Sequence, residues 1–263
     1  MKLPRCLLLL LLGMFSLSVA EVVDSFKETC PQFFIKNNNN KAITPTVFNA
    51  NQYKQICQFY KGEYRFATLY DTYHRIPVYS AFTYSTTEHR QIHNIPNQAD
   101  TCTNKQDSSL NIKYTRGHVF PKSYAQGTQQ KESTFTLTNA APQTEESNRK
   151  WAKHVEEPML EEIKGNCDNK SLVYIVTGVV PGETWLPIKR GVKIEKGVNI
   201  PRYFWTAFSC KPKKNKIDSH AYIAELFLCT VFTFLFCVSN DTRHKTHNTN
   251  MQINSLKYIF CNQ

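Results

Sequence analysis

The sequence lacks several features that would assign it to a common class of protein. No hydrophobic run reaches the roughly 20 residues that a transmembrane helix needs, no Cys-x-x-Cys pair of a zinc site is present, and no stretch rich in Pro, Gly and Ser divides the chain. Acidic residues are also scarce, with 21 Asp and Glu against 32 Lys and Arg. These absences argue against a zinc finger or a two-domain chain, and they favour one basic domain.

The first 20 residues have the pattern of a secretory signal peptide. Lys2 and Arg5 are basic, Leu7–Leu12 is apolar, and Ser18–Ala20 ends in the small residues that precede a cleavage site. Because the apolar run is shorter than a membrane span, we expect cleavage rather than an uncleaved anchor. The expected mature chain begins at Glu21 and is secreted.

The expected mature chain holds an even number of cysteines, which in an oxidising compartment predicts disulfides rather than metal binding. We expect Cys30 to pair with Cys57 and Cys167 with Cys210, a pairing that spacing alone does not establish. The other four cysteines are Cys102, Cys229, Cys237 and Cys261. In the same compartment, two Asn-x-Ser/Thr sequons are candidate glycosylation sites, at Asn169 and Asn240.

The charge of the chain is strongly positive. Its formal net charge is +11, and removal of Lys2 and Arg5 with the signal peptide leaves +9. Such an excess suits a polyanionic partner, because each phosphate that is neutralised releases counterions. Charge alone does not choose between nucleic acid, heparan sulfate and an anionic membrane.

Several segments outside the central motifs have strand or loop patterns. An aromatic-rich hairpin is expected from Tyr64–Tyr70 and Ile76–Tyr84, with a turn between them. The β-branched run Leu172–Val180 predicts a buried central strand. Two further strands are expected at Arg202–Cys210 and His220–Glu225. Polar surface loops are expected at Lys36–Lys41 and Ser85–Lys113.

Three short motifs follow one another in the middle of the chain. They are Tyr114–Pro121 (YTRGHVFP), Thr138–Gln143 (TNAAPQ) and Asn148–Trp151 (NRKW). We expect His118 at the end of a short strand, with Pro121 stopping regular structure after it. Thr134–Asn139 alternates apolar and polar residues and predicts a second strand, which Pro142 ends.

A helix is expected to follow the second strand. From Asn148 onward, apolar residues recur every four positions, which predicts an amphipathic helix. These residues are Trp151, Val155, Met159 and Ile163. Pro158 should bend or weaken the last turns. Strand, strand and helix in this order are what a ββα-metal finger requires.

His118 is the candidate general base, although a single histidine is more often structural than catalytic. Arg116 lies two residues earlier, so strand alternation places both side chains on one face, and Gly117 between them allows close backbone approach. A neutral imidazole can take a proton from a water that attacks phosphorus. Arg116 can hold a phosphate oxygen; its alternative role is a surface salt bridge.

The two asparagines are candidate metal ligands. Mg²⁺ prefers oxygen ligands and keeps several waters, so one amide oxygen with phosphate oxygens can suffice. Asn148 has a helix N-cap as its alternative role, and Asn139 a turn at the end of a strand. On the helix, Arg149, Lys150 and Lys153 are candidate contacts to the polyanion backbone, or they form a solvated face.

The linked motifs resemble the DNA/RNA non-specific endonuclease family, the His-Me finger nucleases that include mitochondrial endonuclease G. More narrowly, three segments resemble the endonuclease domain-containing 1 proteins of vertebrates, namely Arg75–Ala81, Gly178–Gly182 and Val198–Ala207. The resemblance extends from about Phe26 to Glu225 and then stops. It implies His118 as general base, Asn148 as the principal Mg²⁺ ligand, and support from Asn139 and Arg116.

The chain departs from the family pattern in two places near this site. The family motif opens with Asp-Arg-Gly-His, but Thr115 occupies the Asp position here, and the loss of that Asp is expected to lower activity. Trp151 lies three residues after Asn148 rather than four. Counting eight residues from Asn148 reaches Glu156, a candidate supporting residue, whereas counting from Trp151 reaches Val155.

The tail beyond Glu225 has no evident connection to the rest of the fold. Leu226–Val238 is apolar and too short for a transmembrane helix, and a polar stretch follows it. A buried strand pair, a membrane-associating segment and a translated non-coding sequence are the interpretations left open. We therefore divide the chain into a signal peptide (1–20), an endonuclease domain (21–225) and an atypical tail (226–263).

The sequence as a whole predicts a secreted α+β protein with a mixed or antiparallel sheet and an embedded ββα-metal finger. The expected activity is Mg²⁺-dependent hydrolysis of phosphodiester bonds in DNA and RNA, with no obligate protein partner. Base preference should be weak, because contacts to the backbone carry no sequence information. The alternative is a catalytically weakened relative that binds polyanions, with membrane association through the tail.

Overall fold

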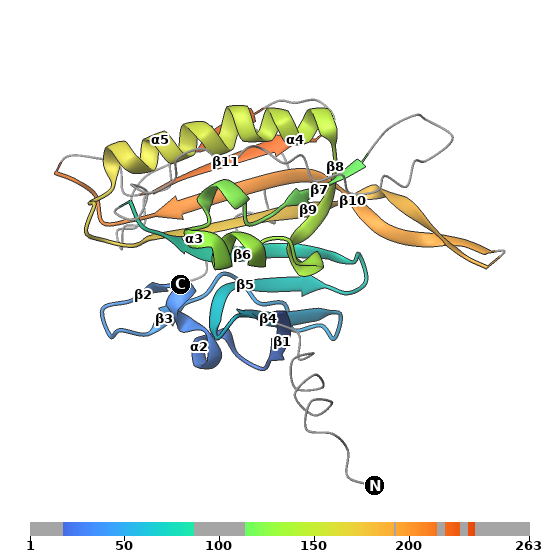
Figure 1. Ribbon diagram of the computed structural model, residues 1–263, viewed down its shortest axis with the longest axis horizontal. Coiled ribbons are helices and arrows are strands. Elements are labelled where there is room, and N and C mark those ends of the chain that lie inside the picture. Colours follow the sequence, from blue (N-terminus) through green and yellow to red (C-terminus); the bar gives the residue numbers. More distant parts are fainter. Residues whose placement is uncertain (1–17, 87–113, 192, 215–218, 227–230, 235–263) are drawn as a thin grey trace, which may run out of the picture.

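The computed structural model describes residues 18–86, 114–191, 193–214, 219–226 and 231–234, and an eight-stranded sheet forms its central layer (Figure 1). The strands lie in the order β1-β4-β5-β6-β9-β10-β11-β12, each antiparallel to its neighbours. Their bounds are β1 Ser18–Val23, β4 Tyr53–Tyr60, β5 Glu63–Asp71, β6 Ile76–Tyr84, β9 Val173–Arg190, β10 Lys193–Ser209, β11 Ser219–Glu225 and β12 Val231–Phe234. The fold is α+β with an antiparallel sheet, as the sequence predicted.

The predicted hairpin is present as β5 and β6, with Ala67 opposite Ala81. The middle residues of both strands are buried on consecutive positions rather than on alternate ones, because the sheet is covered on both faces. The predicted central strand is the first half of β9, between β6 and β10. Of the two further strands predicted after it, the first is the last part of β10 and the second is β11.

The N-terminal segment covers one face of the sheet. Its elements are α2 (Phe26–Thr29), the 3₁₀ turn η1 (Pro31–Phe33), and the short strands β2 (Ile35–Lys36) and β3 (Ala42–Ile43). Phe26, Phe33 and Phe34 pack there against Tyr79 and Trp205 of the sheet. The asparagine run forms the exposed turn between β2 and β3, as predicted.

The opposite face carries a two-stranded ribbon and a long helix. The elements are β7 (Tyr114–His118), η3 (Lys122–Tyr124), α3 (Gly127–Ser133), η4 (Leu137–Asn139), β8 (Ala140–Thr144), α4 (Glu145–Trp151), the π turn η5 (Ala152–Glu156) and α5 (Glu157–Asn166). The helix residues Trp151, Val155 and Ile163 and the sheet residues Phe82 and Ile175 are buried in one core. The predicted apolar stripe of the helix is therefore its buried face.

The second strand of the finger was predicted in the wrong place. Thr134 caps the end of α3, and Leu137–Asn139 is a 3₁₀ turn. The strand is instead β8, where Pro142 lies opposite Arg116. A ribbon of two strands gives each strand a free edge, so a residue without an N–H is tolerated there. The order strand, strand, helix still holds.

The helix also starts earlier than predicted. It begins at Glu145, and Thr144 is its N-cap, with its hydroxyl accepting a hydrogen bond from the Ser147 N–H. Asn148 is therefore an interior residue, and its alternative role as N-cap is wrong. The irregular turn, η5, precedes Pro158 rather than following it. This position suits proline, because it lies in the first turn of α5, where no N–H partner is lost.

Two disulfides tie the outer segments to the sheet, in the predicted pairing. Cys30 is bonded to Cys57 and Cys167 to Cys210, across sequence separations of 27 and 43 residues. In the chain-entropy account, loops of this length correspond to about 3.5 and 4 kcal/mol of stabilisation. The remaining cysteines of the expected mature chain lie outside the described residues.

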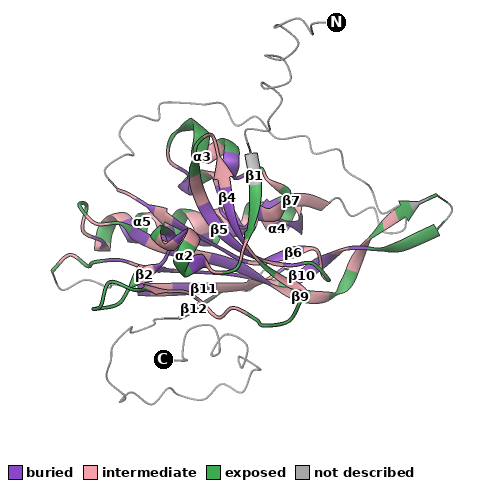
Figure 2. Cartoon of the chain, turned by 90° about the horizontal axis from the view of Figure 1, so that it is seen from below, coloured by how far each residue is buried: buried purple, intermediate pink, exposed green. Residues whose placement is uncertain are grey.

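Strands β9 and β10 continue past the sheet as a two-stranded arm, residues 182–190 and 193–199, which projects from one end of the molecule (Figure 1). Figure 2 shows that exposed residues dominate this arm while buried residues fill the centre of the sheet. At the edge of the sheet opposite β1, β12, which lies in the apolar part of the tail, pairs with β11. Within the described residues, no helix is long and apolar enough to cross a membrane.

Candidate active site

His118 is the last residue of β7 and lies opposite Ala140 of β8. The two residues that follow, Val119 and Phe120, are fully buried, and the Phe120 ring stacks on Phe82 of the sheet at 3.9 Å. The chain is thus anchored immediately after the histidine. The imidazole is half-buried, its Nε2 is shielded from solvent, and its ring meets Phe135 edge to face at 4.8 Å.

Gly117 is required by the close approach of β8. A Cβ at this position would overlap the Gln143 side chain and lie 3.0 Å from the Ala141 carbonyl oxygen. Arg116, next to it, is exposed and belongs to the same face of the strand as His118. Its guanidinium makes no ion pair with any side chain in the described part of the chain, so the alternative role as a salt bridge is not seen. The group is available to an anion.

Asn139 is fully buried, and both ends of its amide are engaged with protein groups. Its oxygen accepts hydrogen bonds from the Ser80 hydroxyl at 3.0 Å and the Phe120 N–H at 2.8 Å. Its nitrogen donates to the carbonyls of Phe120 and Thr134 at 3.0 and 2.9 Å. An amide oxygen with two donors and no exposure does not fit the predicted role of a metal ligand. Asn139 instead fixes the chain around His118.

Asn148 is half-buried on α4 and faces β7. Its amide nitrogen donates a hydrogen bond to the Thr115 hydroxyl at 3.4 Å, and that hydroxyl donates to the Gln143 carbonyl at 3.3 Å. With the nitrogen committed to Thr115, the amide oxygen makes no hydrogen bond to the residues that the structure describes. Thr115, at the position of the family Asp, therefore orients Asn148.

Glu156 lies at the end of η5, two turns after Asn148. Burial raises the pKa of its carboxyl to about 8, against the opposing effect of the hydrogen bond from the Ser123 hydroxyl. The Tyr124 hydroxyl donates to the Glu156 carbonyl oxygen at 2.6 Å. Part of the residue surface remains in solvent, and the Ser123 hydroxyl lies 3.5 Å from one carboxyl oxygen. Glu156 connects the helix to the segment after β7.

The basic residues of α4 and η5 differ in their availability. Arg149 and Lys153 are exposed, whereas the Lys150 ammonium pairs with Glu146 at 2.6 Å. The hydrogen bond from Lys150 lowers the pKa of the Glu146 carboxyl. At such an exposed position, an i, i+4 pair contributes little to stability. A phosphate can therefore displace Glu146 from Lys150 at small cost.

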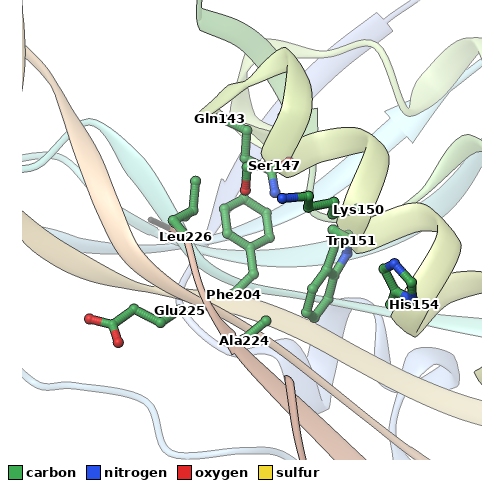
Figure 3. A pocket seen from close by; sticks show the side chains of 9 residues that line it. All are labelled: Gln143, Ser147, Lys150, Trp151, His154, Phe204, Ala224, Glu225 and Leu226. Carbon is green, nitrogen blue, oxygen red and sulfur yellow. The ribbon is translucent and has the colours of Figure 1, made fainter. Parts of the chain in front are cut away.

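A small cavity lies on the other side of α4, between that helix and strands β10 and β11 (Figure 3). Trp151, Phe204 and Leu226 form its apolar wall, with Lys150 and Glu225 at its rim. Its volume of about 20 Å³ accommodates one water molecule. None of the predicted site residues His118, Arg116 and Asn148 lines it. The cavity is therefore separate from the candidate active site.

A metal site made only of ionisable ligands is not found among the described residues, because no three His, Cys, Asp or Glu side chains cluster there. The donor that remains is the amide oxygen of Asn148. One neutral oxygen suits Mg²⁺, which keeps most of its waters and takes further oxygens from phosphate. The residues present therefore fit a site with a single protein ligand.

The structure brings most of the predicted residues to one ribbon and the start of one helix. His118 and Arg116 share β7, Asn148 reaches the same strand through Thr115, and Asn139 lies behind His118. The sequence did not predict the contact of Phe135 with His118.

Of the predicted glycosylation sites, Asn169 is exposed, and Asn240 lies outside the described residues.

Comparison with known proteins identifies the family to which the chain belongs. The model of a family described as DNA/RNA non-specific endonuclease matches residues 39–254, which extends past Glu225, where the resemblance was expected to stop. Among curated proteins, the human Endonuclease domain-containing 1 protein is 30% identical over 207 residues, and the mouse protein of that name is 26% identical. Each alignment covers 69% of this chain and 38% of the relative.

This chain thus spans less than half the length of the curated relatives that it matches. A solved structure, titled as the EndoG/EndoGI complex and the mechanism of EndoG inhibition, matches with a TM-score of 0.41 and 22% identity. That match covers 68% of this chain and 74% of the other. A likeness this distant carries no argument about the site.

Proposed function

Because the chain belongs to the DNA/RNA non-specific endonuclease family, we propose that it is a secreted endonuclease that hydrolyses phosphodiester bonds of DNA and RNA with the help of Mg²⁺ or another divalent cation. The observation that carries this proposal is the ββα arrangement. It places Asn148, with its amide oriented by Thr115, against the strand that ends at His118. The predicted chemistry needs a base, a cation ligand and a phosphate clamp on adjacent elements.

In this proposal His118 is the general base. Its imidazole takes a proton from the attacking water, a role that typically contributes 10² to 10⁴-fold in rate. The anchoring of Phe120 on Phe82 and the edge contact of Phe135 hold the ring in one orientation. Arg116, exposed on the same strand face, holds a non-bridging phosphate oxygen through its planar guanidinium.

The amide oxygen of Asn148 is the proposed protein ligand of the cation. When bound, a divalent cation would stabilise the charge on the phosphate and on the leaving oxygen. Thr115 keeps the amide nitrogen turned away, so that the oxygen remains available. Asn139 is assigned to positioning, since its four hydrogen bonds link β6, the residue after Val119 and the end of α3.

The remaining candidate residues support binding. Arg149, Lys150 and Lys153 on the helix contact the phosphate backbone, and Glu156 braces the helix against the segment that follows β7. Contacts of this kind read no base, which agrees with cleavage of many sequences in both DNA and RNA. The two disulfides suit an oxidising compartment, which supports secretion, and Asn169 is the exposed glycan acceptor.

A plasmid-nicking assay on the secreted chain tests the proposal. The parent protein is expected to nick plasmid DNA and degrade a structured RNA in Mg²⁺ and to do neither in EDTA. Asn148→Ala should lose activity at all Mg²⁺ concentrations, while Asn166→Ala, at the far end of the same helical segment, should behave like the parent. Activity that survives EDTA, or an Asn148→Ala protein as active as the parent, would contradict it.

A second candidate function is polyanion binding without cleavage. The observation that favours it is the neutral contact between Thr115 and Asn148, which at 3.4 Å replaces the charged contact that an Asp would make. A gel-shift experiment on plasmid DNA separates the two functions. Salt-sensitive binding by a parent protein that leaves the plasmid intact in Mg²⁺, Mn²⁺ and Ca²⁺ would select the second candidate.

A further inference from the structure

An exposed aromatic side chain projects from the turn between β5 and β6, at the base of the arm. Tyr73 is 61% exposed, yet its ring is held by two others. The centre of its ring lies 4.8 Å from the centre of the His74 ring, and the two ring planes meet at 90°. The Trp185 ring of the arm lies 5.7 Å away, centre to centre, with an angle of 87° between the planes. A large aromatic that remains exposed while being braced by neighbouring rings is available to stack on a ligand.

The turn that carries Tyr73 is fixed by one buried carboxylate. Asp71 is 2% exposed, and one of its carboxyl oxygens accepts hydrogen bonds from the backbone N–H groups of Tyr73 and His74 at 2.9 and 3.0 Å. The His74 ring lies 2.6 Å from the other oxygen. Arg75 completes the turn with a φ of 59°, a left-handed conformation that is uncommon for a side chain of this size. The exposure of Tyr73 is therefore built into the fold.

The turn is also joined to the arm. The Trp185 ring stacks on the His74 ring, with 5.3 Å between the ring centres and 20° between the planes. The Asn199 N–H donates a hydrogen bond to the His74 carbonyl at 2.9 Å. The Arg75 guanidinium donates to the carbonyls of Lys196 and Gly197 at 3.2 and 3.1 Å. Segments more than 100 residues apart in sequence thus form one rigid surface.

This surface is basic. The Lys196 ammonium lies 5.6 Å from the centre of the Trp185 ring. Exposed lysines on the arm are Lys189, Lys193 and Lys196, and its acidic residues are Glu183 and Glu195. We call Tyr73, Trp185, Arg75 and Lys196 the stacking platform.

We propose that the stacking platform binds unpaired nucleotides of single-stranded DNA or RNA, with a base on Tyr73 and the backbone on Arg75 and the arm lysines. Aromatic faces combined with a positive groove are the recognition chemistry of single-stranded nucleic acids, because every base has a face to stack. A duplex hides those faces.

The position of the platform agrees with a strand that also reaches the active site. Ser80 of β6 donates to Asn139, behind His118, and Ile76 starts the same strand beside the turn. Four residues of strand correspond to about 13 Å, which a few nucleotides can cover. Figure 1 shows the β5–β6 turn, the base of the arm and the strands β7 and β8 toward the same end of the molecule. The inference rests on the proposed function, since the bound strand is then the substrate.

Binding measured with a catalytically silenced protein tests the platform. In the His118→Ala background, the affinity for fluorescein-labelled oligothymidylate is measured by anisotropy and compared with that for a fluorescein-labelled duplex hairpin. Tyr73→Ala is expected to weaken oligothymidylate binding by about 5- to 150-fold, as loss of one stacked base predicts, with a much smaller effect on the duplex. Tyr73→Phe keeps the ring and should bind like the background protein. Phe48→Ala removes another exposed aromatic, 37% exposed, and should also have no effect.

Two further measurements make the outcome decisive. Lys196→Gln should reduce the salt dependence of oligothymidylate binding by about 0.7 in the log–log slope, as loss of one phosphate contact predicts. Thermal unfolding shows whether Tyr73→Ala is folded, and Tyr73→Leu replaces it if it is not. Unchanged oligothymidylate binding by the folded variant, or an equal loss for single strand and duplex, overturns the platform. A parent that cuts no nucleic acid overturns the proposed function instead, whatever the binding result.

Discussion

Thr115 is the residue on which the potency of the proposed site depends. Its hydroxyl accepts a hydrogen bond from the Asn148 amide and donates one to the Gln143 carbonyl. In the family pattern that the sequence resembles, an Asp occupies this position. A carboxylate would make a charge-assisted hydrogen bond, which is roughly twice as strong as a neutral one. The threonine keeps the orientation of Asn148 but holds it less firmly.

Replacing Thr115 tests this interpretation directly. Thr115→Asp is expected to raise the cleavage rate by about fivefold, which is the effect of about 1 kcal/mol of better positioning. Thr115→Val keeps the shape but has no hydroxyl, so it should lower the rate and raise the Mg²⁺ concentration needed for half-maximal cleavage. Initial rates on a fluorescent oligonucleotide across a Mg²⁺ titration measure both effects. An Asp variant slower than the parent would refute the assignment.

Glu156 gives a prediction about stability and pH. Burial raises its pKa from 4.5 to about 8, so between these values the folded protein keeps a proton that the unfolded chain releases. The free energy of unfolding should therefore fall as pH rises through this window. Glu156→Gln has no proton to lose, so its Tm should fall less than that of the parent between about pH 5 and pH 8. Thermal unfolding of both proteins checks this, and equal slopes against pH would show that the carboxyl is not buried.

At the scale of elements, the ribbon β7–β8 and helix α4 act as one unit. Asn139 links the end of β7 to β6 and to the end of α3 through its buried amide. Gly117 lets β8 approach closely enough for Gln143 and Ala141 to fill the space that a side chain would take. The position of His118 is thus determined by segments on three sides.

The two asparagines should respond differently to substitution. Asn139→Ala leaves several buried backbone and hydroxyl groups without partners, each worth about 1–3 kcal/mol, so a marked drop in Tm is expected with loss of activity. Asn148→Ala, at a half-buried position, should lose activity with a Tm close to that of the parent. Thermal unfolding and nicking assays on the same preparations compare them. A stable Asn139→Ala protein that cleaves slowly and needs more Mg²⁺ than the parent would return Asn139 to the role of metal ligand.

Sequence patterns predicted those elements that have a distinctive local composition or a regular repeat. The hairpin β5–β6 was found from its aromatic-rich segments, β9 from its β-branched run, and the buried stripe from Trp151 to Ile163 from its four-residue period. The second strand of the finger was misplaced, because the alternation of Thr134–Asn139 arises from a helix end and a 3₁₀ turn. Pro142 also argued against the true strand, since the sequence alone does not show that β8 has a free edge.

At the scale of the whole molecule, two covered faces of one sheet hold the site in place. The N-terminal segment is tied to β4 by Cys30–Cys57, and the end of α5 is tied to the end of β10 by Cys167–Cys210. The even cysteine count of the expected mature chain predicted disulfides, whereas the pairing itself was an expectation that spacing alone did not establish. The helix that carries Asn148 is therefore fastened at its far end.

Contacts between distant segments were beyond the reach of sequence patterns. The engagement of Asn139 depends on Ser80, 59 residues away, and the joining of Arg75 to the arm depends on a separation of more than 120 residues. Neither leaves a local period in the sequence. His118, Arg116 and Asn148 were predicted because their motifs are local, whereas the role of Asn139 needed the tertiary structure.

The rate of phosphodiester cleavage with and without the His118 imidazole tests the central claim most directly. The secreted parent, His118→Ala and a matched control, His154→Ala on the exposed side of the helix, are compared at saturating Mg²⁺ on one fluorescent oligonucleotide. Loss of a general base should lower the rate at least about 100-fold while the control keeps the parent rate. A His118→Ala protein that cleaves at the parent rate would contradict the account.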